Sequence, residues 1–230
     1  MLHLMQEVSG SLHSFYFRMT TKPIETIEHL LEKLTPFGVA FSLNANERMS
    51  LSQDNGKSFI VLMSSGCFSI THSASNLYIS TVFAPSITGL VDSYGSHYDV
   101  KHSPRHDIRA ETRCEGWLVP LDIFVQKCYE LNLWHDVAKI LAHRIMCLSA
   151  RDSEMVGSDA YSKIRALLLE VGLYPEEIRH QITISSFIQR RTNISRSRVM
   201  GVLSALKKGE YLEIKSGKLI SINKKLPVEF

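Results

Sequence analysis

Between Ser185 and Gly209 the chain carries two short helical patterns joined by a polar turn, and this arrangement limits its fold more than any other feature. The first pattern, Ser185–Arg191, has the length of a short helix that Ser185 can cap. Thr192–Ile194 follows as a turn. Ser195 can cap a second helix that reaches Lys208, and Gly209 ends it. The second helix has one apolar stripe, made by Val199, Val202, Leu203 and Leu206. Together these features predict a helix-turn-helix.

A hairpin and a local excess of positive charge accompany this motif. Tyr211–Lys215 and Lys218–Ile222 predict two strands around Ser216-Gly217, which would form the wing of a winged helix. The net charge of the whole chain is only +3, but residues 183–225 hold ten basic and two acidic residues, a charge of +8. The remainder holds 16 basic and 21 acidic residues, a charge of −5. Polyanion binding by the basic part is one explanation, and a solvated lysine-rich face is the other.

The start of the second helix is the part of a helix-turn-helix that enters the DNA major groove. Arg196 can donate two hydrogen bonds to guanine, and the neighbouring serines can reach bases or phosphates. The lysines farther out are better placed for phosphate contact. A basic helical pair that binds protein instead of DNA is the alternative. We expect DNA contacts from Arg190, Arg191, Ser195, Arg196, Ser197, Arg198, Met200, Lys207, Lys208, Lys215 and Lys218.

Upstream, the pattern predicts one helix and then a strand-rich region. Helical spacing marks Pro23–Leu34, which Pro36 and Gly38 stop. Asp54–Gly56 between two apolar runs, Met49–Leu51 and Phe59–Met63, predicts a hairpin. No helix is expected between the strands, so an antiparallel sandwich or barrel such as a jelly roll is favoured. The other strands are expected at Val39–Leu43, Cys67–Thr71, Leu77–Phe83 and Asp107–Val119.

Beyond residue 121 the hydrophobic period becomes helical. Leu121–Glu130 predicts a short helix, and residues 132–150 predict a long one with an apolar face wider than one β-domain can cover. A helix from a second copy would cover the rest, so we expect a homodimer. An ordinary core helix buried on two sides is the alternative. The expected dimer residues are Trp134, Val137, Leu141, Ile145 and Leu148.

The polar stretch at residues 151–159 is the expected domain boundary. After it come an amphipathic helix that Gly172 ends and a short helix that opens at Pro175. The fold class is therefore α+β. We expect an N-terminal helix and β-sandwich at residues 1–121, dimerisation helices at 122–156 and a winged helix-turn-helix at 157–230.

Other classes of protein lack support in the sequence. The four cysteines form no CxxC pair, which favours the reducing cytosol over a disulfide framework or a structural zinc site. No apolar run reaches the roughly 18 residues of a membrane helix, and no secretory signal is visible, so we expect a cytoplasmic protein with no membrane partner. Walker A, GxGxxG, HExxH and GxSxG motifs are absent, so we expect no enzyme.

Two weaker signals concern metals and thiols. A presumed loop gathers His97, His102 and His106 with Asp99 and Asp107, but the spacing fits no known metal site, and we expect none. Cys114 and Cys128 each follow a basic residue, which is the environment of a redox-sensing thiol. The alternative, which we favour, is that Cys67, Cys114, Cys128 and Cys147 are buried small hydrophobes.

The run from Ile164 to Leu226, with RRTNISRSRVMGVLSALKKGEYLEIKSGKLISIN, closely resembles the enterobacterial proteins named for inhibition of hydrogen peroxide resistance. These are relatives of the Crp/Fnr group of transcription regulators. The similarity continues more faintly through the β-region, where FAPSITGLVD is a recognisable patch. The wider group implies an N-terminal jelly roll of the cyclic-nucleotide-binding type, a long dimerisation helix and a C-terminal winged helix.

The resemblance carries over only in part at the recognition helix. Ser195 and Arg196 align with the serine and arginine that open this helix in the catabolite activator, where the arginine reads guanine. Ser197 stands where that protein has a glutamate, and Gly201 replaces a basic residue that contacts phosphate. We therefore expect a shared mode of binding and a different operator sequence.

The sensor half departs further from the group. The cyclic-nucleotide pocket there needs a Gly-Glu-Leu turn, whose Glu binds ribose, and an Arg-Ser pair, whose Arg neutralises the phosphate. The corresponding patch here is Thr88-Gly89-Leu90, with no such Glu and no clear Arg-Ser pair. Burying an unpaired phosphate is costly, so we expect no cyclic-nucleotide binding by that mechanism. The cysteine spacing does not provide an iron–sulfur site, and no haem ligand can be assigned, so no cofactor is expected.

Taken together, the sequence predicts a homodimeric transcription regulator that binds double-stranded DNA. RNA polymerase is a further expected partner, and the resemblance implies a link to oxidative-stress resistance. The alternative is a regulator that acts through protein contacts and whose winged helix no longer reads DNA.

Overall fold

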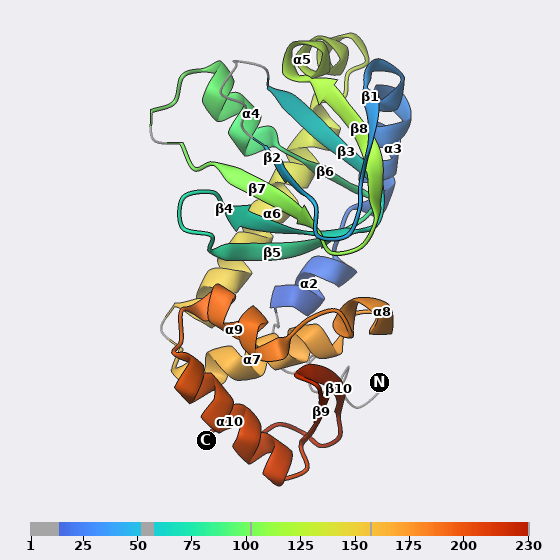
Figure 1. Ribbon diagram of the computed structural model, residues 1–230. Coiled ribbons are helices and arrows are strands. Elements are labelled where there is room, and N and C mark those ends of the chain that lie inside the picture. The colour runs from blue at the N-terminus through green and yellow to red at the C-terminus, as the bar shows by residue number, and fades with distance from the viewer. Residues whose placement is uncertain (1–13, 52–57, 102, 157, 230) are drawn as a thin grey trace. The chain divides into compact units, whose positions relative to one another are not determined.

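The computed structural model describes residues 14–51, 58–101, 103–156 and 158–229 (Figure 1). Residues Pro23–Ala142 form one compact unit, called the β-unit below. The described residues before Pro23 and from His143 onward form the second, called the winged-helix unit. The helix α6 (Trp134–Met155) contributes residues to both units.

The β-unit contains two antiparallel sheets, each of four strands within the described residues (Figure 1). One sheet has the strand order β1-β8-β3-β6 and the other the order β2-β7-β4-β5. This order is that of a jelly roll, so the predicted α+β fold with a jelly roll is confirmed. The strands are β1 (Val39–Leu43), β2 (Arg48–Ser50), β3 (Phe59–Ser65), β4 (Cys67–His72), β5 (Tyr78–Phe83), β6 (Ser86–Thr88), β7 (His106–Ala110) and β8 (Cys114–Pro120).

The position of strand β3 between two core clusters explains why its sequence is continuously apolar from Phe59 to Met63. Successive side chains of a strand point to opposite faces of the sheet. On one face Ile60 and Leu62 belong to the core cluster that the helices of the unit cover. On the other face Val61 and Met63 belong to the cluster between the two sheets, which includes Phe68 of β4. Both faces of β3 are buried, and each fully buried side chain of this kind contributes about 1.5–3 kcal/mol to stability.

Two strand predictions were wrong in their pairing. Strand β2 pairs with β7, and β3 pairs with β8 and β6, so the predicted hairpin between them does not form. The expected turn at 54–56 lies outside the described residues. The single run predicted at Asp107–Val119 is two strands, β7 and β8, in different sheets. In both cases the chain crosses from one sheet to the other: β2 and β3 belong to different sheets, and so do β7 and β8.

The sequence analysis also missed strand β6 and helix α4 (Leu90–His97), which lies between β6 and β7. Gly95 and two serines weaken the helical pattern of α4. Gly89 precedes the helix with φ +96°, and a Cβ there would lie 3.0 Å from the carbonyl oxygen of Phe59. Ser93 of α4 donates to the same oxygen at 2.7 Å. Tertiary contacts with β3 thus hold a helix that local sequence barely favours.

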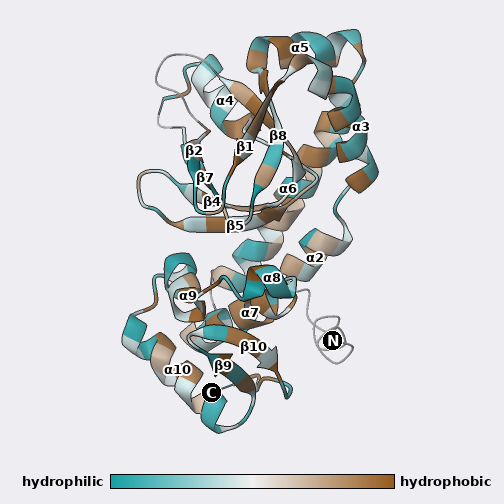
Figure 2. Ribbon diagram, turned by 45° about the vertical axis from the view of Figure 1, so that its right-hand side comes forward, coloured by the Kyte–Doolittle hydropathy of each residue, from teal (hydrophilic) through white to brown (hydrophobic). Residues whose placement is uncertain are grey.

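Two helices of the β-unit bury one face each, as the sequence predicted. The helix α3 (Ile24–Leu34) buries Ile27, Leu30 and Leu34 and leads into the short 3-10 helix η1 (Thr35–Phe37). The helix α5 (Leu121–Glu130) has the predicted bounds. Figure 2 shows hydrophobic and hydrophilic segments alternating along both α3 and α5, which is the colouring of amphipathic helices.

The winged-helix unit contains helices and one hairpin. The predicted helix-turn-helix and wing are confirmed. The polar stretch Arg151–Glu154 is helical and belongs to α6, where a flexible boundary was expected. Ser185 lies inside the first motif helix, and Thr183 occupies its N-cap position. The elements are α2 (Ser14–Thr20), the end of α6, α7 (Ala160–Gly172), α8 (Glu176–Arg179), α9 (Ile184–Thr192), α10 (Arg196–Lys208), β9 (Leu212–Lys215) and β10 (Lys218–Ile222).

Candidate nucleic-acid interface

Ser195 begins α10 as the sequence predicted. Its hydroxyl accepts a hydrogen bond from the backbone N–H of Arg198 at 3.4 Å, a long N-cap contact that satisfies one free donor of the first turn. The hydroxyls of Ser195 and Ser197 lie 3.2 Å apart. The predicted stripe is buried: Val199, Val202, Leu203 and Leu206.

Burial of that stripe fixes the rotation of α10 about its axis. The rest of the helix surface is exposed, and on it lie Arg196 at the start of the helix and Lys207 and Lys208 near its end. Within the described part of the chain these three side chains form no ion pair. Arg198 differs, since its charge helps to lower the pKa of Asp159, which the backbone N–H of Ser162 lowers most.

The turn between α9 and α10 depends on a left-handed residue. Asn193 has φ +58° and ψ +21°, a conformation that asparagine tolerates better than most residues. Thr192 donates its hydroxyl to the carbonyl oxygen of Ile188 at 2.7 Å, and the N–H of Ile194 donates to that hydroxyl at 3.3 Å. These contacts set the angle at which α10 leaves α9.

A buried ion pair positions α9 on α7. The Nη1 atom of Arg191 lies 2.8 Å from Oε1 of Glu170, and each side chain is 3% exposed. The hydroxyl of Tyr174 donates to the same oxygen at 2.5 Å, and Nη2 of Arg18 lies 3.5 Å from it. Arg191 was expected to contact DNA, but its guanidinium is inside the unit, so we leave it out of the contact surface. Sequence reasoning missed Glu170, whose signal is one carboxylate in the apolar run Leu167–Val171.

The wing forms the predicted tight hairpin. Ser216 and Gly217 have φ +49° and +76°, which suits a two-residue turn with positive φ at both positions. Lys215 pairs with Glu213 at 2.8 Å. Lys218 donates to the carbonyl oxygen of Gln181 at 2.8 Å and to the hydroxyl of Thr183 at 3.2 Å. Both lysines therefore remain near the surface while contacting their own chain.

The expected dimer residues divide into two groups. Val137 is buried, and Trp134 is half-buried, both against the core cluster of the β-unit. Leu141, Ile145 and Leu148 are 37%, 66% and 51% exposed. These last three are the expected dimer residues with the largest exposed fractions.

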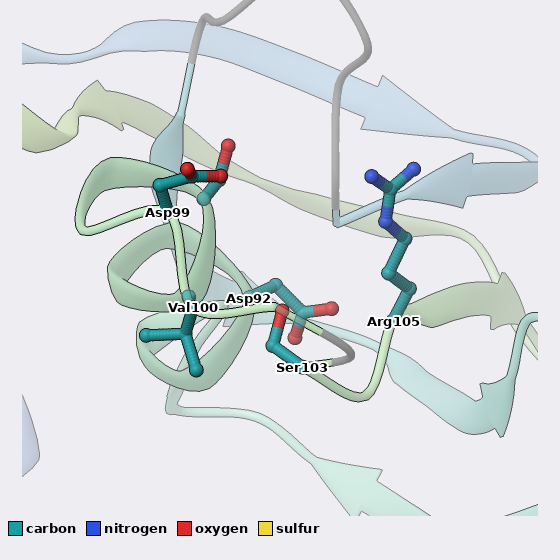
Figure 3. Close-up of a pocket in the computed structure, with 7 residues that line it drawn as sticks. Asp92, Asp99, Val100, Ser103 and Arg105 are labelled. Atoms are coloured by element: carbon teal, nitrogen blue, oxygen red, sulfur yellow. The ribbon is translucent and has the colours of Figure 1, made fainter.

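Beside α4 the β-unit has a small polar cavity of about 120 Å³, lined by Asp92, Gly95, Ser96, Asp99, Val100, Ser103 and Arg105 (Figure 3). Ligand pockets are typically about 300–1,000 Å³. The carboxylate of Asp92 is buried and accepts from the backbone N–H of His106 at 2.7 Å and lies 3.0 Å from its Nδ1. The lining carries two carboxylates, Asp92 and Asp99, against one guanidinium, Arg105, so its formal charge of −1 is unfavourable for a cyclic phosphate.

The structure also shows the surroundings of the histidines, carboxylates and cysteines that the sequence analysis considered for metal binding and thiol sensing. No group of three potential metal ligands occurs in the described ranges, and His102 lies outside them. Cys67, Cys114 and Cys128 are buried. Burial raises the pKa of Cys114 to about 11 and that of Cys128 to about 12, and it also raises the pKa of Cys147. A protonated thiol is a poor nucleophile, so these environments are unfavourable for direct sensing.

Comparison with known proteins agrees with this geometry. A family model described as winged helix-turn-helix DNA binding matches residues 160–228. The inhibitor of hydrogen peroxide resistance of Escherichia coli K12 is 33% identical over 211 residues, which is 91% of this chain and 98% of that protein. Its namesake in Salmonella typhimurium LT2 is 30% identical, with the same two shares covered.

Solved structures share the fold at low identity. The c-di-GMP responsive global regulator CLP of Xanthomonas campestris has a TM-score of 0.65 at 15% identity and covers 86% of this chain and 100% of its own. A regulator of the Crp/Fnr family from Eubacterium rectale has a TM-score of 0.61 at 14% identity and covers 86% and 89%.

The jelly roll, the long helix and the C-terminal winged helix thus form an architecture of the Crp/Fnr type. Within that class, the similarity along nearly the whole chain is specific. The chain belongs to the inhibitor of hydrogen peroxide resistance family. Across the residues that the structure describes, no helix has the length and apolarity needed to cross a bilayer.

Proposed function

We propose that this chain is a homodimeric transcription regulator that recognises specific double-stranded DNA and acts in the control of peroxide resistance. The observation that carries the proposal is the exposed side of α10, where Arg196, Lys207 and Lys208 project from a capped helix whose other side is buried. A helix so oriented can place its first turn in the major groove while its far end meets the phosphates.

The contact roles follow from side-chain chemistry and position. Arg196 is the base-reading residue, because its guanidinium can donate to both O6 and N7 of guanine. Ser195, Ser197 and Arg198 complete the first turn and reach bases or phosphates. The outer basic residues bind phosphate and set the salt dependence, and they are Arg190, Lys207, Lys208, Lys215 and Lys218.

Dimerisation supplies the second half-site. Leu141, Ile145 and Leu148 recur at helical spacing on α6 and expose apolar side chains. Pairing these faces from two copies would bury them and present two recognition helices about 34 Å apart, one turn of DNA. The regulator, rather than an enzyme, would act in the cytoplasm on DNA and contact RNA polymerase there.

Selection of duplexes from a random library by the full-length protein, followed by gel-shift titration, tests DNA recognition. We expect a selected sequence with two related half-sites and an affinity that falls steeply with salt. Arg196→Ala should cost about 1–3 kcal/mol on that sequence and relax one base preference. Lys208→Ala should weaken binding to all sequences and flatten the salt slope by about one unit.

Two outcomes would contradict the proposal. If Arg196→Ala and Lys208→Ala have equal, sequence-independent effects, Arg196 does not read a base. If the protein shows no salt-sensitive binding to any DNA, the winged helix serves protein contacts instead.

Sedimentation of full-length variants tests the dimer. Ile145→Asp should yield a monomer with weaker operator binding, because a carboxylate in an apolar interface is costly. Lys139→Glu changes charge on a different, exposed side of α6 and should remain dimeric. A dimeric Ile145→Asp variant would exclude this face.

A further inference from the structure

Gly201 has no explanation within the fold of the described residues. It lies in the middle of α10, and its φ is not among the positive glycine values. Apart from its two chain neighbours and the adjacent helix backbone, a Cβ added to it would meet nothing within 4 Å. Glycine is less favourable than every residue except proline inside a helix, so alanine would be the better choice for the free protein. A glycine that only weakens its helix points to close approach from outside.

Met200, the residue beside it, is an apolar side chain on an otherwise polar surface. It is 46% exposed, and its exposed neighbours on the helix are Arg196, Ser197 and Ser204. Arg196 and Met200 are four residues apart and therefore lie on the same strip of the helix. Single exposed apolar residues are common on protein surfaces. Here the residue occupies the second turn of the helix, next to the place that the missing side chain of Gly201 leaves open.

The chemistry of this pair selects one feature of DNA. A methionine thioether has no hydrogen to donate and is only a weak acceptor, so it cannot read the polar edges of bases well. Thymine presents a 5-methyl group in the major groove, and apolar side chains are suited to it. The space beside Met200 that Gly201 leaves free can admit a methyl group close to the helix backbone.

We propose that Met200 and Gly201 together form the contact for a thymine 5-methyl group, one step along the operator from the base that Arg196 reads. This inference rests on the proposed function, because it assigns a specificity to the same helix. The contact predicts that the operator contains a thymine that is recognised by its methyl group and not by its hydrogen-bonding edge.

Deoxyuridine substitution in the duplexes that the wild-type protein selects tests the contact directly. Each thymine of one half-site is replaced in turn, which removes only the methyl group. One position should bind about fourfold more weakly, equivalent to about 0.8 kcal/mol. Met200→Ala should lose a similar factor on the thymine duplex and show no further loss on the deoxyuridine duplex. Met200→Leu keeps an apolar side chain and should retain sensitivity to the methyl group.

Gly201→Ala separates a role in binding from a role in folding. We expect its thermal midpoint to rise by about 2–4 °C while its affinity for the thymine duplex falls, because the added methyl group fills the space. Equal methyl sensitivity of the wild type and Met200→Ala would overturn the inference, as would unchanged operator affinity in Gly201→Ala. Both results leave the proposed function intact. A wild-type protein that selects no sequence would refute the inference together with the proposed function.

Discussion

Replacing Glu170 by glutamine should destabilise the winged-helix unit strongly. The carboxylate is 3% exposed and faces the buried Arg191 at 2.8 Å and the partly exposed Arg18 at 3.5 Å. Burial, with Arg191 next, lowers the pKa of Arg151, and the charge of Glu170 opposes this shift, so Glu170 interacts with that cation as well. Glutamine keeps an oxygen for the Tyr174 hydroxyl but removes the charge that balances these cations. Removing one partner of a buried ion pair costs about 3–5 kcal/mol, and we expect a loss in that range.

The contacts also predict an order among variants. Arg191→Met leaves Glu170 with the Arg18 guanidinium and the Tyr174 hydroxyl, so less charge remains uncompensated than in Glu170→Gln. We therefore expect a smaller loss, about 1–3 kcal/mol. Arg18→Met, whose side chain is 22% exposed, should cost least of the three.

Urea unfolding followed by far-ultraviolet circular dichroism measures these losses. Both tryptophans, Trp117 and Trp134, belong to the β-unit, so their fluorescence gives a separate signal for that unit. The part of the helical signal that comes from the winged-helix unit should be lost in Glu170→Gln at lower urea than the tryptophan change, and the helices of the β-unit should unfold with the tryptophans. A loss below 1 kcal/mol in Glu170→Gln, or a larger loss in Arg191→Met, would refute the reasoning.

Three further results are expected. Ser195→Ala should lower the free energy of unfolding by about 0.5–1 kcal/mol, the low end for the loss of an N-cap, because the capping hydrogen bond is long. Ser204→Ala, which removes no cap, should not lower it, and urea titrations of both variants measure the difference. Burial, with Arg144 next, lowers the pKa of Lys22 to about 8, below its unfolded value of 10.5. Between these two pH values the unfolded chain binds more protons than the folded one, so the free energy of unfolding should rise as the pH rises. Lys22→Met should flatten that rise in urea midpoints measured from pH 7 to 10, and an unchanged slope would contradict it. Iodoacetamide at pH 7 should label the native protein only slowly, and at Cys147 first, because the other three thiols are buried; rapid labelling of a buried cysteine would disprove this.

Local signals in the sequence were sufficient where neighbouring residues decide the structure. Helix α5 has both predicted bounds, and α10 begins at the predicted cap Ser195 and ends before Gly209. The wing needed only two alternating runs around Ser216-Gly217. Caps, periodicity and turn residues act within a few positions, so one sequence suffices to find them.

Long-range choices could not be predicted in the same way. The pairing of β2 with β7 joins Met49 to Ile108, far apart in the chain, and nothing local distinguishes it from a hairpin with β3. Helix α4 is stabilised by contacts with β3 that cannot be predicted from the sequence of the helix itself. The burial of Arg191 could not be predicted either, because in the sequence it does not differ from its neighbour Arg190. Only the structure shows that Glu170 of another helix forms an ion pair with it.

The packing of α2 in the winged-helix unit sets the order in which the protein can be completed during synthesis. Phe15 of α2 lies 5.1 Å from the ring of Tyr174, and 152 positions separate Arg18 from Glu170. At about 5–20 residues per second, the ribosome needs roughly 8–30 s to make that interval. During this time the β-unit can fold while α2, already made, has no partner for its apolar face. The tertiary contacts of α2 can therefore form only after α7 has been synthesised, although α2 is made first.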